Sequence, residues 1–173
     1  DVPVGLEFST TLGYADDSFE SELSQWVFSL NYSDFPVVLD RHLFKTDFQV
    51  AGFWDRDTKE LVNTISSINL SYYWLKSHKQ RLFVGLSYDH GKNLTADELL
   101  PLGGDKGLRG YPSEYLLGER RLLLNLEHRY FFDAHYLNLF RFAGVLFFDM
   151  GQTKNDTNTI REDSDLLTST GLG

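Results

Sequence analysis

The chain alternates apolar and polar residues with a period of two through eight separate segments, and this alternation restricts its fold more than any other feature. Successive side chains of a β-strand point to opposite faces, so a two-residue period predicts strands. The predicted strands lie at residues 6–14, 25–34, 43–54, 67–74, 82–89, 120–131, 141–151 and 166–173. No segment shows a helical period of useful length. We therefore predict an all-β chain whose polar connections join sequential strands as an antiparallel meander.

The apolar faces of these strands carry many large aromatic residues, often near the strand ends. In segment 25–34 the apolar face consists of Trp26, Phe28, Leu30 and Tyr32. The opposite faces are mostly Ser, Asn, Thr, Gln and charged residues, which would make a poor hydrophobic core. An apolar exterior with aromatic ends and a polar interior is typical of a transmembrane β-barrel. A soluble sandwich or lipocalin-like barrel alternates in the same way and remains an alternative.

The composition excludes several classes of function. A formal net charge of -9 over 173 residues leaves no basic footprint for nucleic acid. The absence of cysteine excludes disulfide frameworks and thiolate metal sites. Zinc-ligand spacing is also missing from the histidines considered, which are His42, His78, His90, His128 and His135. Because no nucleophile-elbow motif or catalytic triad is recognisable either, we predict neither a cofactor nor an enzyme activity.

The connection at 91–118 is long and has no sustained period. Connections of this length are usually functional or disordered. Within it, residues 102–110 contain four of the 14 glycines, and glycine lets a loop fold back tightly on itself. The predicted loop motif consists of Gly103, Gly104, Gly107, Leu108, Gly110 and Tyr111. We predict that Arg109, within this motif, lies at the tip of a loop that folds back into a barrel.

Two carboxylates are predicted to receive Arg109. Alternation places Asp149 and Glu127 on the inward faces of neighbouring strands, where a guanidinium between them would relieve their repulsion through charge-assisted, bidentate hydrogen bonds. The predicted role of this contact is mechanical, since it would hold the loop against the barrel wall. The alternatives are a solvated Arg109, an Asp149 that merely ends a strand, and a Glu127 that pairs with Arg129 or Arg121.

Three stretches, in this order along the chain, resemble the Omp85 superfamily of surface-antigen barrels. Residues 108–111, Leu-Arg-Gly-Tyr, resemble the Arg-Gly-Phe/Tyr signature of the sixth extracellular loop. Residues 125–130 resemble the family strand that carries an inward glutamate. The third stretch matches a Phe-x-Asp-x-Gly signature, with Phe147, Asp149 and Gly151 at its fixed positions. The resemblance covers about residues 100–173.

The resemblance implies a barrel of about sixteen antiparallel strands in the bacterial outer membrane. Residues 1–173, with the inserted loop 91–118, would then form one partial-barrel domain of about eight strands. The implied function is insertion or translocation of proteins, with outer-membrane lipid and a client or secreted polypeptide as partners. A POTRA or other N-terminal domain is a further possible partner. The alternatives are a soluble β-barrel that binds a small apolar ligand and a passive porin.

Eight strands of a larger barrel have two long edges without partners, and such edges tend strongly to pair. We therefore expect the chain alone to close into a smaller barrel or to dimerise edge to edge.

Overall fold

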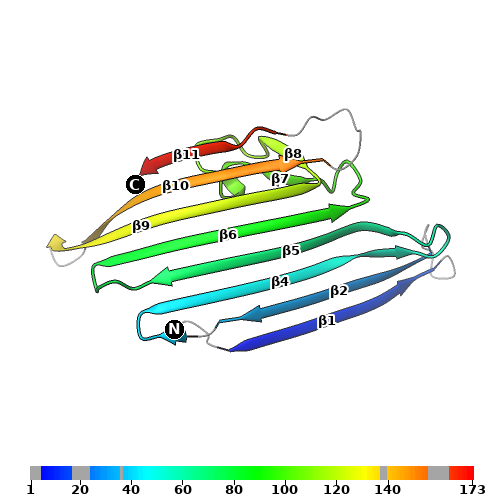
Figure 1. The fold of residues 1–173 in the computed structure, drawn as a ribbon, viewed down its shortest axis with the longest axis horizontal. Coiled ribbons are helices and arrows are strands. Elements are labelled where there is room, and N and C mark those ends of the chain that lie inside the picture. The colour runs from blue at the N-terminus through cyan, green and yellow to red at the C-terminus, as the bar shows by residue number, and fades with distance from the viewer. Residues whose placement is uncertain (1–4, 17–23, 36, 137–139, 156–163) are drawn as a thin grey trace.

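The computed structural model describes residues 5–16, 24–35, 37–136, 140–155 and 164–173, and they form one broad sheet (Figure 1). Each strand of the sheet pairs antiparallel with the next one along its path. The eight strands are β1 (Leu6–Ala15), β2 (Gln25–Asp34), β4 (His42–Asp55), β5 (Leu61–Trp74), β6 (Gln80–Lys92), β9 (Arg120–Tyr136), β10 (Phe140–Lys154) and β11 (Leu167–Leu172). The predicted antiparallel all-β meander is confirmed.

The strand bounds differ from the predicted segments mainly where the alternation is interrupted. β5 begins at Leu61 rather than at residue 67. The sequence pattern missed its first residues because the pairing of β5 with β4 shifts register between Ala51 and Phe53. Asn63 has a positive φ of 45° near this irregularity. A β-bulge of this kind breaks the two-residue period although the strand continues. The short strand β3 (Val37–Leu39), which pairs with β4, has too few residues for a period to be recognised.

The strand register places the apolar residues of neighbouring strands on one common face. Leu86 on β6 lies opposite Leu70 on β5 and Leu124 on β9. One position further along, Ser87 pairs with Asn69 on the other face. We call these the apolar face and the polar face of the sheet. Leu70 and Leu86 are about two-fifths exposed, so this part of the apolar face is not covered by the chain itself.

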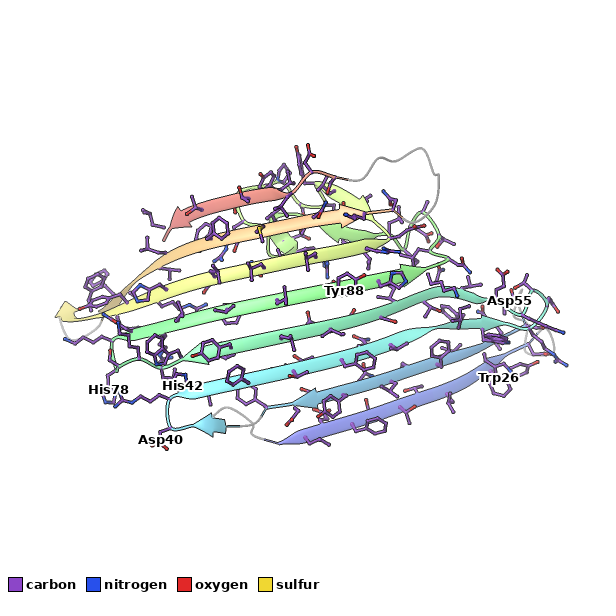
Figure 2. The ribbon with its side chains drawn as sticks, in the orientation of Figure 1. Trp26, Asp40, His42, Asp55, His78 and Tyr88 are labelled. Atoms are coloured by element: carbon purple, nitrogen blue, oxygen red, sulfur yellow. The ribbon has the colours of Figure 1, made fainter. Side chains whose placement is uncertain are left out.

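Aromatic side chains gather toward the two ends of the apolar face. At one end Trp26 pairs with Tyr14 on β1 and with Trp54 on β4. At the opposite end Trp74 on β5 stacks against His42 on β4, with ring centroids 5.8 Å apart. Figure 2 shows Trp26 and His42 at these opposite ends. Within the described part of the chain, no helix is long and apolar enough to span a bilayer.

The sheet is open, so the expectation that the chain closes into a smaller barrel is wrong for this structure. β1 lies at one edge and β11 at the other (Figure 1). A barrel of about eight strands has an interior just wide enough for side chains. Here the backbone of connection 91–118 also lies on the polar face, and an eight-stranded interior would not hold it. Edge-to-edge dimerisation stays a prediction.

The connection 91–118 is more regular than its sequence suggests. It contains a hairpin of β7 (Leu100–Leu102) and β8 (Leu116–Gly118), with the 3-10 turn η2 (Gly104–Lys106) between them. Three-residue strands are too short to show a period. The connection covers the polar face of β9 and β10, where Leu102 and Leu108 are fully buried against Leu123. This small core therefore forms where the loop meets the sheet.

Candidate functional site

Backbone hydrogen bonds fasten the ends of the loop to the sheet. The amide of Gly91, near the end of β6, donates to the carbonyl oxygen of Glu119 at 2.7 Å. The amide of Glu119 donates in turn to the carbonyl oxygen of Lys154, at the end of β10, at 3.0 Å. The loop therefore leaves and re-enters the sheet at neighbouring strands, and its middle can lie over the polar face.

The first part of the loop motif is a close contact between the outgoing and returning chain. The amide of Gly104 donates to the carbonyl oxygen of Pro112 at 3.1 Å. A Cβ atom on Gly103 would lie only 2.3 Å from that same oxygen, and one on Gly104 would lie 2.5 Å from the carbonyl oxygen of Tyr111. Both predicted glycines therefore lie where a side chain would push the two halves of the loop apart.

The second part of the motif turns the chain so that a leucine and an arginine point at the sheet. Gly107 has a φ of +95°, a conformation that glycine adopts far more readily than other residues. The next residue, Leu108, is fully buried, and its amide donates to the carbonyl oxygen of Gly103 at 2.9 Å. Arg109 follows, and Gly110, exposed with a φ of +86°, leads the chain away. The turn thus places Arg109 over the polar face.

Arg109 binds Asp149 through two points of its guanidinium group. Its Nε donates to Oδ2 of Asp149 at 2.8 Å, and its Nη2 donates to Oδ1 at 2.7 Å. The backbone amide of Arg109 donates to Oδ2 at 3.1 Å. Asn125, opposite Asp149 on β9, donates from Nδ2 to Oδ1 at 2.7 Å. Asp149 is fully buried, and these bonds replace the water that a carboxylate would otherwise bind.

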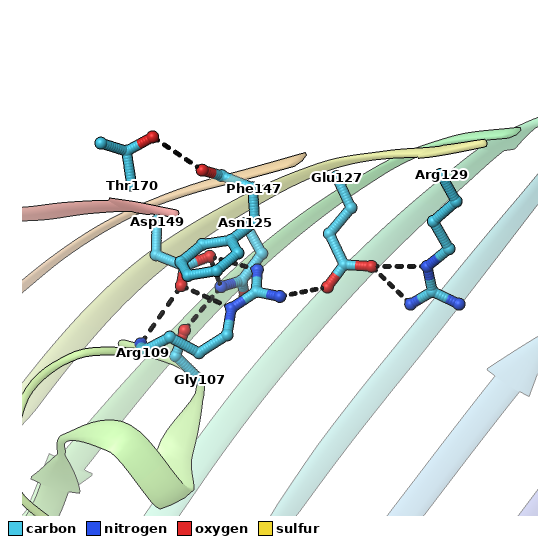
Figure 3. A network of polar contacts seen from close by, with 8 residues as sticks. All are labelled: Gly107, Arg109, Asn125, Glu127, Arg129, Phe147, Asp149 and Thr170. Atoms are coloured by element: carbon cyan, nitrogen blue, oxygen red, sulfur yellow. Dashed lines mark hydrogen bonds and ion pairs between the residues drawn. The ribbon is translucent and has the colours of Figure 1, made fainter. Parts of the chain in front are cut away.

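Glu127 receives the remaining side of the same guanidinium group (Figure 3). Arg109 Nη1 donates to Oε1 of Glu127 at 2.6 Å. Arg129 donates from Nε to the other oxygen, Oε2, at 2.8 Å. Glu127 therefore bridges one cation from the loop and one from the sheet. We call the contacts of Arg109 with Asp149 and Glu127 the tip contact.

An aromatic ring supports the guanidinium group from one side. The Cζ atom of Arg109 lies 3.9 Å from the ring centroid of Phe147, at cation–π distance. Phe147 lies opposite Gly171 on β11. A Cβ atom on Gly171 would lie 2.6 Å from Cζ of the Phe147 ring. Gly171 therefore gives the ring the space in which it meets Arg109.

Replacing Gly171 by alanine is expected to displace the Phe147 ring and weaken the tip contact. Loss of an exposed or partly exposed cation–π contact costs about 0.5–2 kcal/mol, so loop release should increase without unfolding the sheet. The measurement is hydrogen exchange of the Arg109 amide. The matched control is Gly144→Ala on β10, whose Cβ would lie at an ordinary 3.7 Å from Phe132. Equal exchange in the two variants would remove Gly171 from the site.

The remaining predicted residues lie beside the tip contact. Gly151 on β10 is buried, and a Cβ atom there would lie 3.0 Å from the Leu102 side chain. The Tyr111 hydroxyl donates to the carbonyl oxygen of Thr168 on β11 at 3.1 Å. The structure therefore brings the predicted loop and strand motifs together at one place on the polar face. The functional role of this contact stays a prediction.

Sequence reasoning missed two residues of the site. Asn125 binds Asp149 and also donates to the carbonyl oxygen of Gly107 at 2.6 Å. The strand period places Asn125 on the inward face with Glu127, two positions away, but it predicts no partner for the amide. Gly171 could not have been found in that way, because its role depends on the register between β10 and β11.

The chemistry available at this site is binding rather than bond breaking. The described residues contain no cluster of three or more His, Cys, Asp or Glu side chains that could hold a metal ion. The hydrogen bonds of the tip contact join its own groups to one another, to Asn125 and to Arg129. On the exposed side of the loop, a hydrogen bond from Ser113 holds the pKa of Asp105 below its usual value. The arrangement can therefore hold a loop in place by charge.

Comparison with known proteins found no match among protein-family models, curated proteins or solved structures.

Proposed function

We propose that this chain is part of the transmembrane barrel of an Omp85-type protein that inserts or translocates polypeptides at the bacterial outer membrane. The observation that carries the proposal is the tip contact. Arg109, in a Leu-Arg-Gly-Tyr sequence, binds the buried Asp149 of a Phe-x-Asp-x-Gly sequence. The resemblance predicts this pairing between residues 40 positions apart. A solvated loop arginine would have no reason to make it.

The distribution of side chains over the sheet supports a membrane location. The apolar face is continuous across the strands, has aromatic ends and is left exposed by the chain. Monomeric soluble proteins rarely expose an apolar surface of this extent. A lipid bilayer would cover it, with tryptophan and tyrosine at the two interfaces. A soluble barrel would need its apolar residues inside, where this sheet carries Ser, Asn, Asp and Gln.

The open edges of the sheet support a place within a larger barrel. Among the described residues, each of β1 and β11 has a side without a strand partner in the main sheet. Further strands of the same protein would pair with these edges, because unpaired backbone groups are costly in a membrane. In the proposed mechanism the first and last strands of the completed barrel separate, a client strand pairs with the edge that this exposes, and the pairing drives insertion without a nucleotide. Lipid, client polypeptide and a POTRA or similar domain are the proposed partners.

The loop would act in this mechanism as a removable cover of the barrel interior. The tip contact holds it on the polar face of β9 and β10, and Tyr111 reaches β11. Charged contacts of this kind hold a segment in a defined position. When the contact opens, water can bind the separated charged groups, so the segment can be released. We therefore assign Arg109, Asp149 and Glu127 a mechanical role.

The proposed function is tested by reconstituting the complete gene product in lipid vesicles with a urea-denatured eight-stranded outer-membrane protein as client. Folding of the client is measured by its heat-modifiable migration on gels, and delivery across the bilayer by protease protection of a secreted polypeptide. We expect the wild-type protein to accelerate one of these processes several-fold. Arg109→Ala should lose the acceleration and Lys106→Ala should keep it. No acceleration by the wild type, with an ion conductance that Arg109→Ala leaves unchanged, would instead indicate a passive porin.

A further inference from the structure

A second ion pair holds the base of the same loop. Arg121 on β9 lies opposite Asp89 on β6, and its Nε and Nη2 donate to Oδ2 of Asp89 at 2.9 and 2.8 Å. Ser67 on β5 donates to Oδ1 of the same carboxylate at 2.6 Å. Arg121 Nη1 donates to the carbonyl oxygen of Pro101, in the middle of β7, at 2.8 Å. We call these bonds of Arg121 to Asp89 and Pro101 the base contact.

The arginine of the base contact is better shielded from water than the arginine of the tip contact. The side chain of Arg121 is 18% exposed, whereas that of Arg109 is 31% exposed. Their carboxylate partners Asp89 and Asp149 are both buried. Salt screens charges that water reaches far more than buried pairs. Rising ionic strength should therefore weaken the tip contact first.

The tip contact also has a spare cation, because Glu127 is bound by Arg129 through its second oxygen. Much of the cost of breaking a buried ion pair comes from the charge that is left without a partner. When Arg109 leaves, Glu127 keeps Arg129. Asp149 loses its cover at the same moment, because the departing loop is what shields it, and water can then bind the carboxylate.

The base contact lacks this arrangement. Among the described residues, the cation that pairs with Asp89 is Arg121. Removing Arg121 would leave the buried carboxylate with the Ser67 hydroxyl and would leave the carbonyl oxygen of Pro101 without this donor. Both charged partners belong to the sheet, so the base contact survives when the loop tip moves.

We propose that the loop has a fixed base and a releasable tip. Arg121 and Asp89 hold the β7–β8 hairpin on the sheet, while Arg109 leaves Asp149 and Arg129 keeps Glu127. Arg121 is thus a positioning residue, because it determines where the loop leaves the sheet and hence where Arg109 arrives. The inference deepens the proposed function and rests on it, since a barrel that admits polypeptides must clear its interior. Release also breaks the bond between Tyr111 and Thr168, which separates the loop from β11.

The test is hydrogen exchange, resolved to single amides, on the complete gene product in lipid nanodiscs at low and high NaCl. The tip amides are those of Gly104, Leu108 and Arg109, which donate within the loop and to Asp149. The base amides are those that pair β7 with β8. In the wild type we expect the tip to exchange about tenfold faster than the base, as for a local opening. Added salt should accelerate the tip alone.

Two variants separate the contacts. Arg121→Gln is expected to accelerate exchange at the base by about tenfold, because the buried Asp89 loses its cation. Arg121→Lys, which keeps the charge but cannot reach both Asp89 and Pro101 with a planar fork, should lie between. Arg129→Gln is expected to slow exchange at the tip, because release would then leave Glu127 without a cation. Arg41→Gln is the control, an exposed arginine in the turn before β4 whose Nη1 donates to the carbonyl oxygen of Lys76 at 3.2 Å, and it should change neither region.

Equal exchange rates of tip and base in the wild type and all variants would overturn the inference, since the loop would then open as one unit. Faster or unchanged tip exchange in Arg129→Gln would overturn the role of the spare cation. If Arg121→Gln does not fold, Arg121→Lys decides the role of the base contact. These measurements read the loop directly and need no client polypeptide. A failed insertion assay would therefore contradict the proposed function. The hydrogen-exchange rates of the tip and base amides would still decide whether the loop tip opens separately from its base.

Discussion

Arg109→Ala is expected to release the loop and to destabilise the protein. Removing one partner of a buried ion pair costs about 3–5 kcal/mol when the other charge stays buried. Here the released loop lets water reach Asp149, so the measured loss should lie at or below the lower end of that range. The free energy of unfolding can be measured in urea from the fluorescence of Trp26, Trp54 and Trp74.

Lys106→Ala is the matched control for this prediction. Lys106 is an exposed cation three positions away in the same loop, and its removal should change the free energy of unfolding by no more than about 0.5 kcal/mol. Asp149→Asn tests the pairing itself. Its effect should be much smaller in the Arg109→Ala background than in the wild type, because the two residues act on one contact. Additive effects, or equal losses for Arg109→Ala and Lys106→Ala, would show that Arg109 does not hold the loop.

The strands were predictable from the sequence because one face of each is apolar and the other is polar. In β6, for example, Val84, Leu86 and Tyr88 alternate with Gly85, Ser87 and Asp89, and the period fixes both the strand and its orientation. The period fails where the backbone departs from regular pleating. The shifted register beside Asn63 hid the first part of β5 for this reason.

The partners of Arg109 were predictable for a different reason. The two short motifs suggested which residues meet, and the strand period placed Asp149 and Glu127 on the inward face. The sequence did not show which side chains of different strands and of the loop come within contact distance, because this depends on the strand register and on the path of the loop. The space that Gly171 leaves for Phe147, and the reach of Arg121 to the carbonyl oxygen of Pro101, exist only after the strands are paired.

The predicted closure into a smaller barrel was wrong because it considered only the unpaired strand edges and not the space that the loop needs inside a barrel. Pairing of β1 with β11 would satisfy both edges, yet the loop core of Leu102, Leu108 and Leu123 occupies the space that an eight-stranded barrel would need. A loop of this size therefore leaves too little room for closure into an eight-stranded barrel. The sequence already contained the loop length from which this conclusion follows.

Leu70→Arg is the second substitution with a large expected effect, and it tests the membrane location. Leu70 lies on the apolar face of β5, opposite Leu86 at the centre of β6, and is 42% exposed. An arginine facing lipid at the middle of a transmembrane barrel costs about 2–4 kcal/mol. The same residue facing water would cost almost nothing. We therefore expect a loss in this range for the complete gene product unfolded from lipid vesicles by urea.

The neighbouring substitution Asn69→Arg gives the sharpest comparison, because it adds the same side chain one position away on the polar face. Asn69 pairs with Asp47 and Ser87, and both neighbours can accept a hydrogen bond from a guanidinium group. A water-filled barrel interior should accept this arginine with little change in the free energy of unfolding. If Asn69→Arg proves the more damaging of the two, the polar face is the packed side and the membrane assignment fails. If both are neutral, the apolar face meets water rather than lipid, and the exposed leucines and aromatic residues need another partner.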